Sequence, residues 1–250
     1  YNAMARLAGP NLNAFVAIAG AARGAGLSAP GIIAADPRTG FAIIEDLGDD
    51  LFASAIPKGA PELDLYASAI DGLLALRAAS PAAPAAPGYQ MLTYDETAME
   101  AEVMLVMDWY WAHLNGAAPG DDLRADYRAR WADVLAKLAA PSVMVLRDFH
   151  AENLLWLPER EGFKRAGIID FQDGLIGSPA YDLVSLLEDA RRDVSGDLAA
   201  AMIRRYAKGA AAFNDFDEAM FRRDYAILGA QRNAKILGIF ARLINRDKKP

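Results

Sequence analysis

Two polar residues between short apolar segments constrain this chain more than any other feature. Asp148 and Asn153 are separated by four residues, and Asp170 follows an apolar segment further along the chain. Apolar composition predicts three short strands in this part of the sequence: 142–146, 154–157 and 166–169. The charged segment 158–163 contains Pro and Gly, which predicts a hairpin turn between the second and third strands. This order would bring Asp148, Asn153 and Asp170 to one end of a small sheet.

Carboxylate and amide oxygens in this arrangement suit phosphoryl transfer. In the catalytic loop of kinases, an Asp receives the proton of the attacking hydroxyl and an Asn after four intervening residues holds magnesium. Magnesium prefers hard oxygen ligands, so Asp148 is the expected base and Asn153 and Asp170 are the expected ligands. The spacing is also that of an ordinary Asx turn between two strands. The segment 177–182, which opens a helix after Asp170, favours the catalytic interpretation.

The region from Val145 to Val194 resembles the aminoglycoside phosphotransferase superfamily, whose members are relatives of protein kinases that phosphorylate small molecules. Several segments are similar, more narrowly, to the bacterial anomeric kinases of N-acetylmuramate and N-acetylglucosamine, which serve cell-wall sugar recycling. These segments are 146–156, 170–173, 182–187 and 189–193, with 26–30 and 40–49 upstream. The resemblance therefore covers most of the chain.

The resemblance implies an α+β, protein-kinase-like two-lobe fold. Residues 1–47 would form a partial small, nucleotide-binding lobe with the hinge, and residues 48–250 the large, mostly helical catalytic and substrate lobe. We expect the amino-terminal lobe to be incomplete, because residues 1–10 are too few for the strands that normally precede the first helix. The first Lys is Lys58, so the Lys that kinases carry on the third strand is not found in the expected place.

The resemblance also implies roles for individual residues. Asp148 would be the catalytic base, and Asn153 and Asp170 would hold magnesium. Asp182 would brace the catalytic loop from the start of the following helix. The adenine of ATP would meet four hinge residues: Ile44, Glu45, Asp46 and Leu47.

Two interpretations stay open for each of the remaining polar residues near the loop. His150 would either buttress the loop backbone or take part in the chemistry. Asp173 would be either a solvated, loop-bracing carboxylate or a substrate contact. Arg191 and Arg192, on a predicted helix, would either form a salt-bridged face or bind an anion of the substrate. The candidate substrate contacts are therefore Asp173, Asp189, Arg191 and Arg192.

The implied reaction uses ATP and Mg²⁺ and phosphorylates a hydroxyl of a small molecule. The resemblance favours the anomeric hydroxyl of N-acetylmuramate or N-acetylglucosamine. An aminoglycoside or another amino alcohol is the alternative acceptor. A non-catalytic pseudokinase or binding module is the alternative from a different functional class.

Composition excludes several other classes of protein. A net charge of −7 argues against general nucleic-acid binding, which needs a clustered positive face. The absence of Cys removes disulfides and thiolate sites and fits the reducing cytoplasm, and two His residues are too few for a His-rich zinc site. The sequence contains no run of 18 uncharged apolar residues, so it predicts no membrane-spanning helix. Nothing in the sequence indicates an obligate protein partner.

The remaining patterns predict a mostly helical chain. The apolar spacing in 61–78 follows one face of a helix, and similar patterns predict helices at 11–26, 95–114, 121–138 and 216–245. Two strands, 32–35 and 41–44, surround a turn at 36–40. The segment 80–88, with three Pro among Ala residues, predicts an extended loop.

Overall fold

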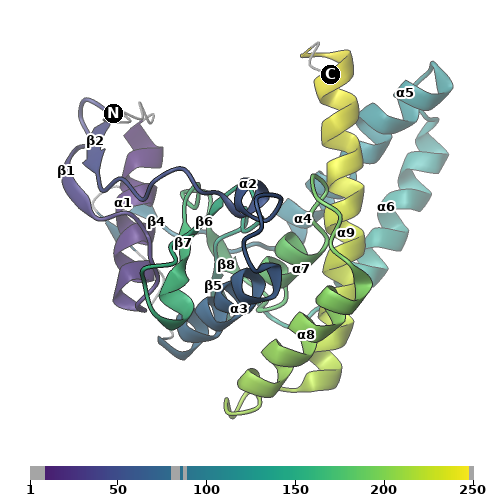
Figure 1. The fold of residues 1–250 in the computed structure, drawn as a ribbon. Helices are drawn as coiled ribbons and strands as arrows, with labels where there is room; N and C mark the ends of the chain where they lie inside the picture. Colours follow the sequence, from purple (N-terminus) through teal and green to yellow (C-terminus); the bar gives the residue numbers. More distant parts are fainter. Residues whose placement is uncertain (1–8, 80–84, 87–88, 248–250) are drawn as a thin grey trace.

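Short strands lie in the middle of the molecule with helices on both sides, and a further strand pair lies at one edge, near the amino terminus (Figure 1). The computed structural model describes residues 9–79, 85–86 and 89–247. The α-helices are α1 (Gly9–Gly24), α2 (Phe52–Ala55), α3 (Glu62–Ala79), α4 (Glu96–Val103), α5 (Trp111–Asn115), α6 (Asp121–Leu135), α7 (Tyr181–Leu187), α8 (Gly196–Ala210) and α9 (Glu218–Asn245). A π-helical turn, η1 (Val106–Tyr110), and a 3-10 turn, η2 (Gly162–Arg165), complete the helical elements.

The strands of the described chain form four separate antiparallel pairs, each of two strands. The pairs are β1 (Ile32–Asp36) with β2 (Phe41–Ile44), β3 (Ala85–Ala86) with β4 (Tyr89–Gln90), β5 (Val143–Val145) with β8 (Leu175–Gly177), and β6 (Leu154–Trp156) with β7 (Ala166–Ile168). The three strands predicted around the polar loop are confirmed as β5, β6 and β7, and the predicted hairpin joins β6 to β7. The two strands predicted near the amino terminus are confirmed as β1 and β2.

The helix predicted at 95–114 is interrupted, so that prediction was wrong in part. Asp95 caps α4 by accepting a hydrogen bond from the N–H of Ala98 at 2.9 Å, but α4 ends at Val103 and the π turn η1 follows. The long helix α9 presses on this break, because a Cβ on Gly238 would lie 2.4 Å from Cβ of Leu105. Tertiary packing therefore determines the backbone here.

Two other predictions also need correction or restriction. The segment 189–193, expected to continue a helix, forms turns instead, since α7 ends at Leu187 and α8 begins at Gly196. The loop predicted at 80–88 lies mostly outside the described residues, and within it the pair 85–86 forms β3. The other long helices are confirmed as α1, α3, α6 and α9.

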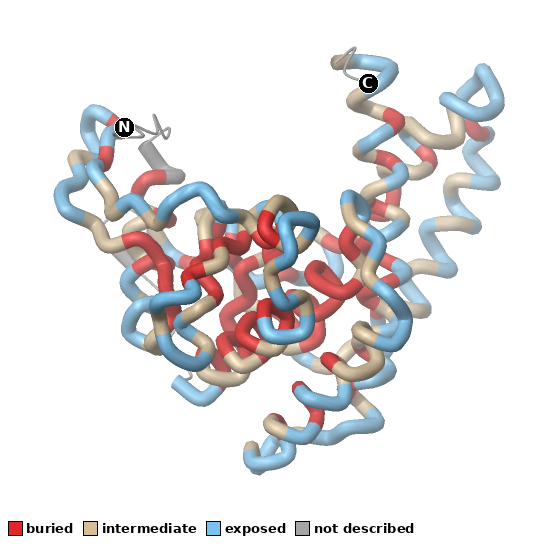
Figure 2. Tube along the Cα trace, in the orientation of Figure 1, coloured by how far each residue is buried: buried red, intermediate tan, exposed pale blue. Residues whose placement is uncertain are grey.

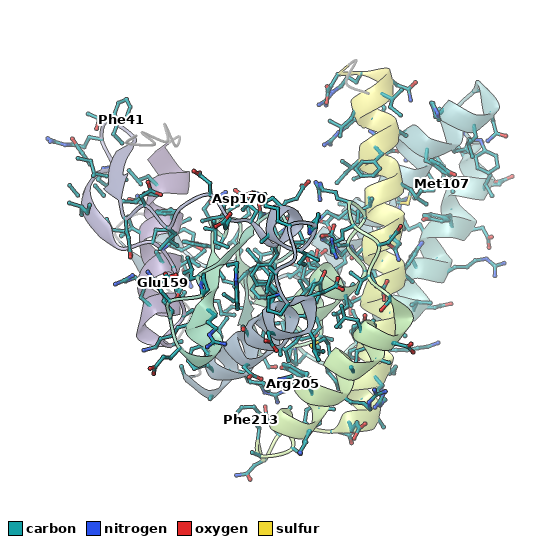
Figure 3. The ribbon with its side chains drawn as sticks, in the orientation of Figure 1. Phe41, Met107, Glu159, Asp170, Arg205 and Phe213 are labelled. Carbon is teal, nitrogen blue, oxygen red and sulfur yellow. The ribbon has the colours of Figure 1, made fainter. Side chains whose placement is uncertain are left out.

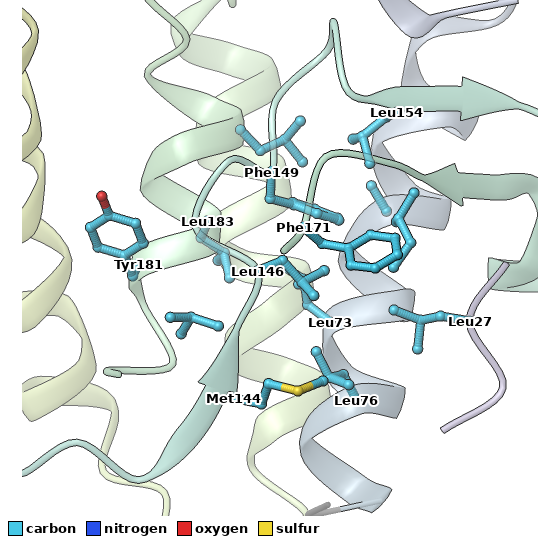
Figure 4. Packing of buried hydrophobic residues seen from close by; sticks show 14 of the residues in the cluster. Leu27, Leu73, Leu76, Met144, Leu146, Phe149, Leu154, Phe171, Tyr181 and Leu183 are labelled. Carbon is cyan, nitrogen blue, oxygen red and sulfur yellow. The ribbon is translucent and has the colours of Figure 1, made fainter. Parts of the chain in front are cut away.

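The buried residues gather in the middle of the molecule, and the hydrophobic core includes the strands that carry the polar loop (Figure 2). Leu146, Phe149 and Phe171 are almost fully buried in it and anchor the loop segments from below (Figure 4). Phe171 also stacks on Phe15 of α1, with ring centroids 5.0 Å apart. One hydrophobic cluster thus includes residues from both sides of the predicted lobe boundary at 47/48, which stays a prediction. No helix in the described part of the chain has the length and apolarity that crossing a membrane requires.

Candidate active site

The polar loop is built on two residues with unusual backbone angles. Arg147, just before Asp148, has a φ of 70°, and Asp170 has a φ of 58°. They are the two residues other than Gly with positive φ in the described chain. This left-handed conformation costs free energy for a residue with a side chain, and it persists only where the surroundings hold it. Such conformations concentrate at functional sites. Here one lies directly before Asp148, and the other is Asp170 itself.

Asp182 holds the strained turn at Arg147. Its two carboxylate oxygens accept hydrogen bonds from the backbone N–H groups of Leu146 and Arg147, at 2.7 Å and 2.9 Å. The hydroxyl of Ser185, one turn along α7, donates to the carbonyl of Arg147 at 3.3 Å. Burial raises the pKa of Asp182 to about 7, although the two backbone hydrogen bonds oppose this rise. Asp182 therefore occupies the position expected of a loop brace.

Asn153 and Asp170 come together at the mouth of the loop. Nδ2 of Asn153 donates to the carbonyl of Asp148 at 2.9 Å and lies 3.4 Å from Oδ2 of Asp170. Oδ1 of Asp170 accepts a hydrogen bond of 2.7 Å from Nε2 of Gln172. Asp170 is exposed, on the upper side of the strand region in Figure 3. The amide of Asn153 thus links the backbone of Asp148 to the carboxylate of Asp170.

The carboxylate of Asp148 is free to accept a proton or a hydrogen bond. It is half-buried, and no described residue makes a hydrogen bond or an ion pair with it. The loop around it is fixed, because the N–H of Asp148 donates to the carbonyl of Leu146 at 2.9 Å and the N–H of His150 donates to the carbonyl of Asp148 at 3.2 Å. A fixed carboxylate without a partner suits a group that orients an attacking hydroxyl.

The donor set fits magnesium better than zinc. Within the described residues, no three or more His, Asp or Glu side chains gather as a metal site. Asn153 and Asp170 offer one amide and one carboxylate. Magnesium commonly takes only one or two carboxylates from the protein, because phosphate oxygens and water complete its octahedron. Asn153 and Asp170 would hold such an ion, with the remaining ligands supplied by a phosphate ester.

His150 lies beneath the loop with an unsatisfied nitrogen. Its Nδ1 is buried without a partner, while Nε2 lies 3.4 Å from Nδ2 of Asn153. Burial is the largest cause that lowers the pKa of His150, so the imidazole is neutral at physiological pH. These contacts fit a buttress for Asn153.

The predicted hinge residues continue β2 towards the loop. Glu45 is held by three groups: the N–H of Gly31 at 2.9 Å, Arg160 at 3.0 Å and Arg23 at 3.3 Å. The hydrogen bond from Gly31 is the largest cause that lowers the pKa of Glu45. Asp46 accepts from the N–H of Gly48 at 2.8 Å. Ile44 and Leu47 are half-buried. The chain then runs along the β6–β7 hairpin, where the N–H of Trp156 donates to the carbonyl of Asp50 at 2.7 Å.

Comparison with known proteins decides the family. The sequence model of the family described as "Phosphotransferase enzyme family" matches residues 6–220. The chain belongs to this phosphotransferase family. The resemblance to the aminoglycoside phosphotransferase superfamily is thereby confirmed.

A bacterial sugar kinase is similar to the phosphotransferase over the whole length of this chain. The N-acetylmuramate/N-acetylglucosamine kinase of Caulobacter vibrioides is 46% identical over 254 residues, which cover 100% of this chain and 69% of that protein. The narrower resemblance to these anomeric kinases is therefore confirmed as well.

Solved structures share the fold of the phosphotransferase at much lower identity. The choline/ethanolamine kinase family protein of Mesorhizobium loti has a TM-score of 0.62 at 18% identity, over 96% of this chain and 73% of that one. Wild-type aminoglycoside 2'-phosphotransferase-IIIa, in a GDP complex, has a TM-score of 0.62 at 16% identity, over 96% and 78% of the two chains. These likenesses confirm the α+β, kinase-like fold with a mostly helical carboxyl-terminal part.

The candidate substrate residues of the phosphotransferase differ in their surroundings. Asp173 is exposed, and its charge adds to the burial that raises the pKa of Tyr89. Asp189 is buried and accepts from the N–H groups of Ala151 and Arg191, at 3.2 Å and 2.9 Å. The side chain of Arg191 pairs with Glu152 at 3.1 Å, and that of Arg192 pairs with Glu62 at 2.5 Å. Both Arg side chains therefore already have carboxylate partners within the phosphotransferase.

A buried polar network behind the loop was not predicted from the sequence. Glu102 of α4 lies at its centre, with ion pairs to Arg147 at 2.9 Å and to Lys235 of α9 at 2.8 Å. Its other oxygen accepts from Nε2 of Gln231 at 3.0 Å and from the hydroxyl of Tyr94. Burial alone would raise the pKa of Glu102, but Lys235 and the hydrogen bonds together lower it. The network ties two distant helices to the residue before Asp148.

One signal in the sequence indicates this network. Glu102 lies between apolar residues at helical spacing, since Met99 and Val103 are buried on the same face of α4. A carboxylate on a buried helix face needs a cationic partner. The partner could not be named from the sequence, because Arg147 and Lys235 are distant along the chain.

Proposed function

We propose that the protein transfers the terminal phosphate of ATP, with Mg²⁺, to the anomeric hydroxyl of N-acetylmuramate or N-acetylglucosamine. The observation that carries the reaction type is the half-buried, unpartnered carboxylate of Asp148 beside the Asn153–Asp170 contact. The acceptor follows from the name of the Caulobacter relative, which is 46% identical over the whole chain.

Asp148 acts as the base in this proposal. Its carboxylate accepts the hydrogen bond of the sugar hydroxyl and takes the proton as the hydroxyl oxygen forms its bond to the γ-phosphorus. The bond from the γ-phosphorus to the bridging oxygen breaks, and ADP leaves with the electron pair. Asn153 and Asp170 would hold the metal, which would neutralise charge on the phosphate oxygens when bound. Gln172 fixes one oxygen of Asp170.

The nucleotide is proposed to lie along the segment that follows β2. Ile44, Glu45, Asp46 and Leu47 would meet the adenine, as expected for a hinge. Glu45 is a poor hydrogen-bond partner for the base, because three other groups already hold its carboxylate. The adenine contacts are therefore assigned to the backbone of these residues and to the side chains of Ile44 and Leu47. Residues 1–47 would form the nucleotide-binding part, and residues 48–250 would form the substrate part. The protein would act in the cytoplasm, where ATP is available.

Phosphorus NMR on a panel of acceptors tests the proposal. The panel contains N-acetylmuramate, N-acetylglucosamine, an aminoglycoside and choline, each with ATP and either Mg²⁺ or EDTA. We expect an anomeric sugar phosphate from the first two compounds only, and no product with EDTA. Product from the aminoglycoside or choline alone would refute the sugar assignment. ATP binding without any product would favour the non-catalytic alternative.

A further inference from the structure

One buried cation near the loop has no hydrogen-bond or ion-pair partner among the described residues. Arg232 of α9 is only 4% exposed, and no described residue makes a hydrogen bond or an ion pair with its guanidinium. Two other Arg residues that are buried or half-buried do have partners: Arg77 pairs with Asp215 at 2.9 Å, and Arg147 pairs with Glu102 at 2.9 Å. The charge of Asp182 acts on Arg232 from a distance, but the N–H groups of the guanidinium have no acceptor in the described chain. A buried donor without an acceptor costs free energy, so such a group is a candidate to bind an anion.

Arg232 lies beside the catalytic loop. Its Cζ atom is 5.9 Å from the ring centroid of Tyr181, the first residue of α7. Burial is the largest cause that lowers the pKa of His150, and the charge of Arg232 lowers it further. The same charge opposes the burial that raises the pKa of Asp182. Arg232 is therefore near both the residue that buttresses the loop and the residue that braces it.

The Nε atom of the Arg232 guanidinium is enclosed by the protein without a partner, whereas its two Nη atoms keep some access to solvent. Nδ1 of His150 and Nε of Arg147 are also enclosed and unpartnered near the loop. A polar ligand between α9 and the loop would satisfy groups that the protein itself leaves unsatisfied.

We propose that Arg232 binds the carboxylate of a sugar acid, the lactyl carboxylate in the case of N-acetylmuramate. The proposal rests on the proposed function, because the two sugars named for the Caulobacter relative differ by this lactyl group. A planar guanidinium matches a carboxylate through two parallel hydrogen bonds. Arg232 is then a specificity-determining residue for the anionic sugar and is dispensable for the neutral one.

Arg191 and Arg192 are less suitable for this role. Arg191 would have to leave Glu152 and Arg192 would have to leave Glu62 before either could bind a substrate anion. Within the described chain, Arg232 has no ion pair to give up. The structure therefore moves the expected anion contact from the turn after α7 to the buried face of α9.

The ratio of kcat/KM for the two sugars tests the inference. Arg232→Met keeps the length of the side chain and removes its charge. We expect kcat/KM for N-acetylmuramate to fall by about 10- to 150-fold, the range for loss of a charge-assisted hydrogen bond, and kcat/KM for N-acetylglucosamine to change by less than about threefold. Arg232→Lys keeps the charge and should retain part of the preference. Arg222→Met, on the same helix in an exposed ion pair with Glu218, is the matched control and should leave both values unchanged.

The outcomes separate this inference from the proposed function. A wild-type protein that phosphorylates neither sugar refutes the proposed function and the inference together. A wild-type protein that uses both sugars, with equal losses in Arg232→Met, overturns only the inference, because a general packing defect does not change the ratio. A shift of the ratio in Arg191→Met, without one in either Arg232 variant, also overturns it.

Discussion

The substitution Glu102→Gln tests most directly whether the buried network of Glu102, Arg147 and Lys235 stabilises the fold. The substitution keeps the shape of the side chain and removes the charge that faces Arg147 and Lys235. The side chain of Glu102 is 14% exposed and that of Lys235 is 10% exposed, so solvent compensates little. Removing one partner of a buried ion pair costs about 3–5 kcal/mol. We take the lower end, about 3 kcal/mol, because the amide still accepts one hydrogen bond.

Urea unfolding at pH 7 measures this loss directly. A loss of about 3 kcal/mol in the free energy of unfolding corresponds to a melting temperature lower by roughly 6–12 °C for a chain of this size. The control is Glu100→Gln on the same helix, where Glu100 pairs with Arg128 at 2.8 Å but both side chains are more than one-third exposed. Surface pairs contribute about 0–1 kcal/mol, so the control should change little.

The reasoning also predicts a pH dependence. Because the pKa of Glu102 is lowered in the folded protein, its stabilisation is present above the ordinary value of 4.5 and is lost as the pH falls through the folded value. Glu102→Gln should therefore lose less stability than the wild type when the pH falls below that value. Equal losses in Glu102→Gln and Glu100→Gln at pH 7 would refute the assignment of a buried network.

Two further perturbations examine the loop itself. His150→Gln should weaken the pH dependence of unfolding. Because the pKa of His150 is lowered from 6.5, the wild type loses stability as the pH falls below that value, by at most about 1.4 kcal/mol per pH unit. Urea unfolding of both proteins at pH 7.5 and 5.5 measures the difference. Identical slopes in the two proteins would count against a buried neutral imidazole. Gln172→Ala frees one oxygen of Asp170, so the Mg²⁺ concentration for half-maximal activity should rise about tenfold while KM for the sugar stays unchanged in a magnesium titration. An unchanged magnesium requirement would contradict the support assigned to Gln172.

The sequence was sufficient for the parts of the site that local order determines. Asp148, Asn153 and Asp170 lie on one loop and the hairpin after it, so the pattern of strands was enough to predict that they meet. Asp182 follows soon after, at the start of α7. The residue types and spacing also carried the family resemblance, which the comparisons confirm.

The parts that depend on distant packing were not predictable. Glu102, Lys235 and Arg232 lie far from the loop in sequence, and only the packing of α4 and α9 brings them beside it. The helix predicted at 95–114 failed for the same reason, because the close approach of Gly238 to Leu105 is a tertiary contact. The sequence left two interpretations open for Arg191 and Arg192, a salt-bridged face or a contact to a substrate anion. Their ion pairs with Glu152 and Glu62 fit the first, and these carboxylate partners could not be named from the sequence.

Phosphate transfer by Asp148→Asn tests the central claim most directly. The measurement compares wild type and variant in magnesium-dependent transfer of labelled γ-phosphate from ATP to N-acetylmuramate, with ATP binding measured separately. Asn cannot accept the proton, so we predict that kcat falls by about 10²–10⁴-fold while the melting temperature and the Kd for ATP stay within error. Transfer by Asp148→Asn at nearly the wild-type rate would show that another group takes the proton and would contradict the account.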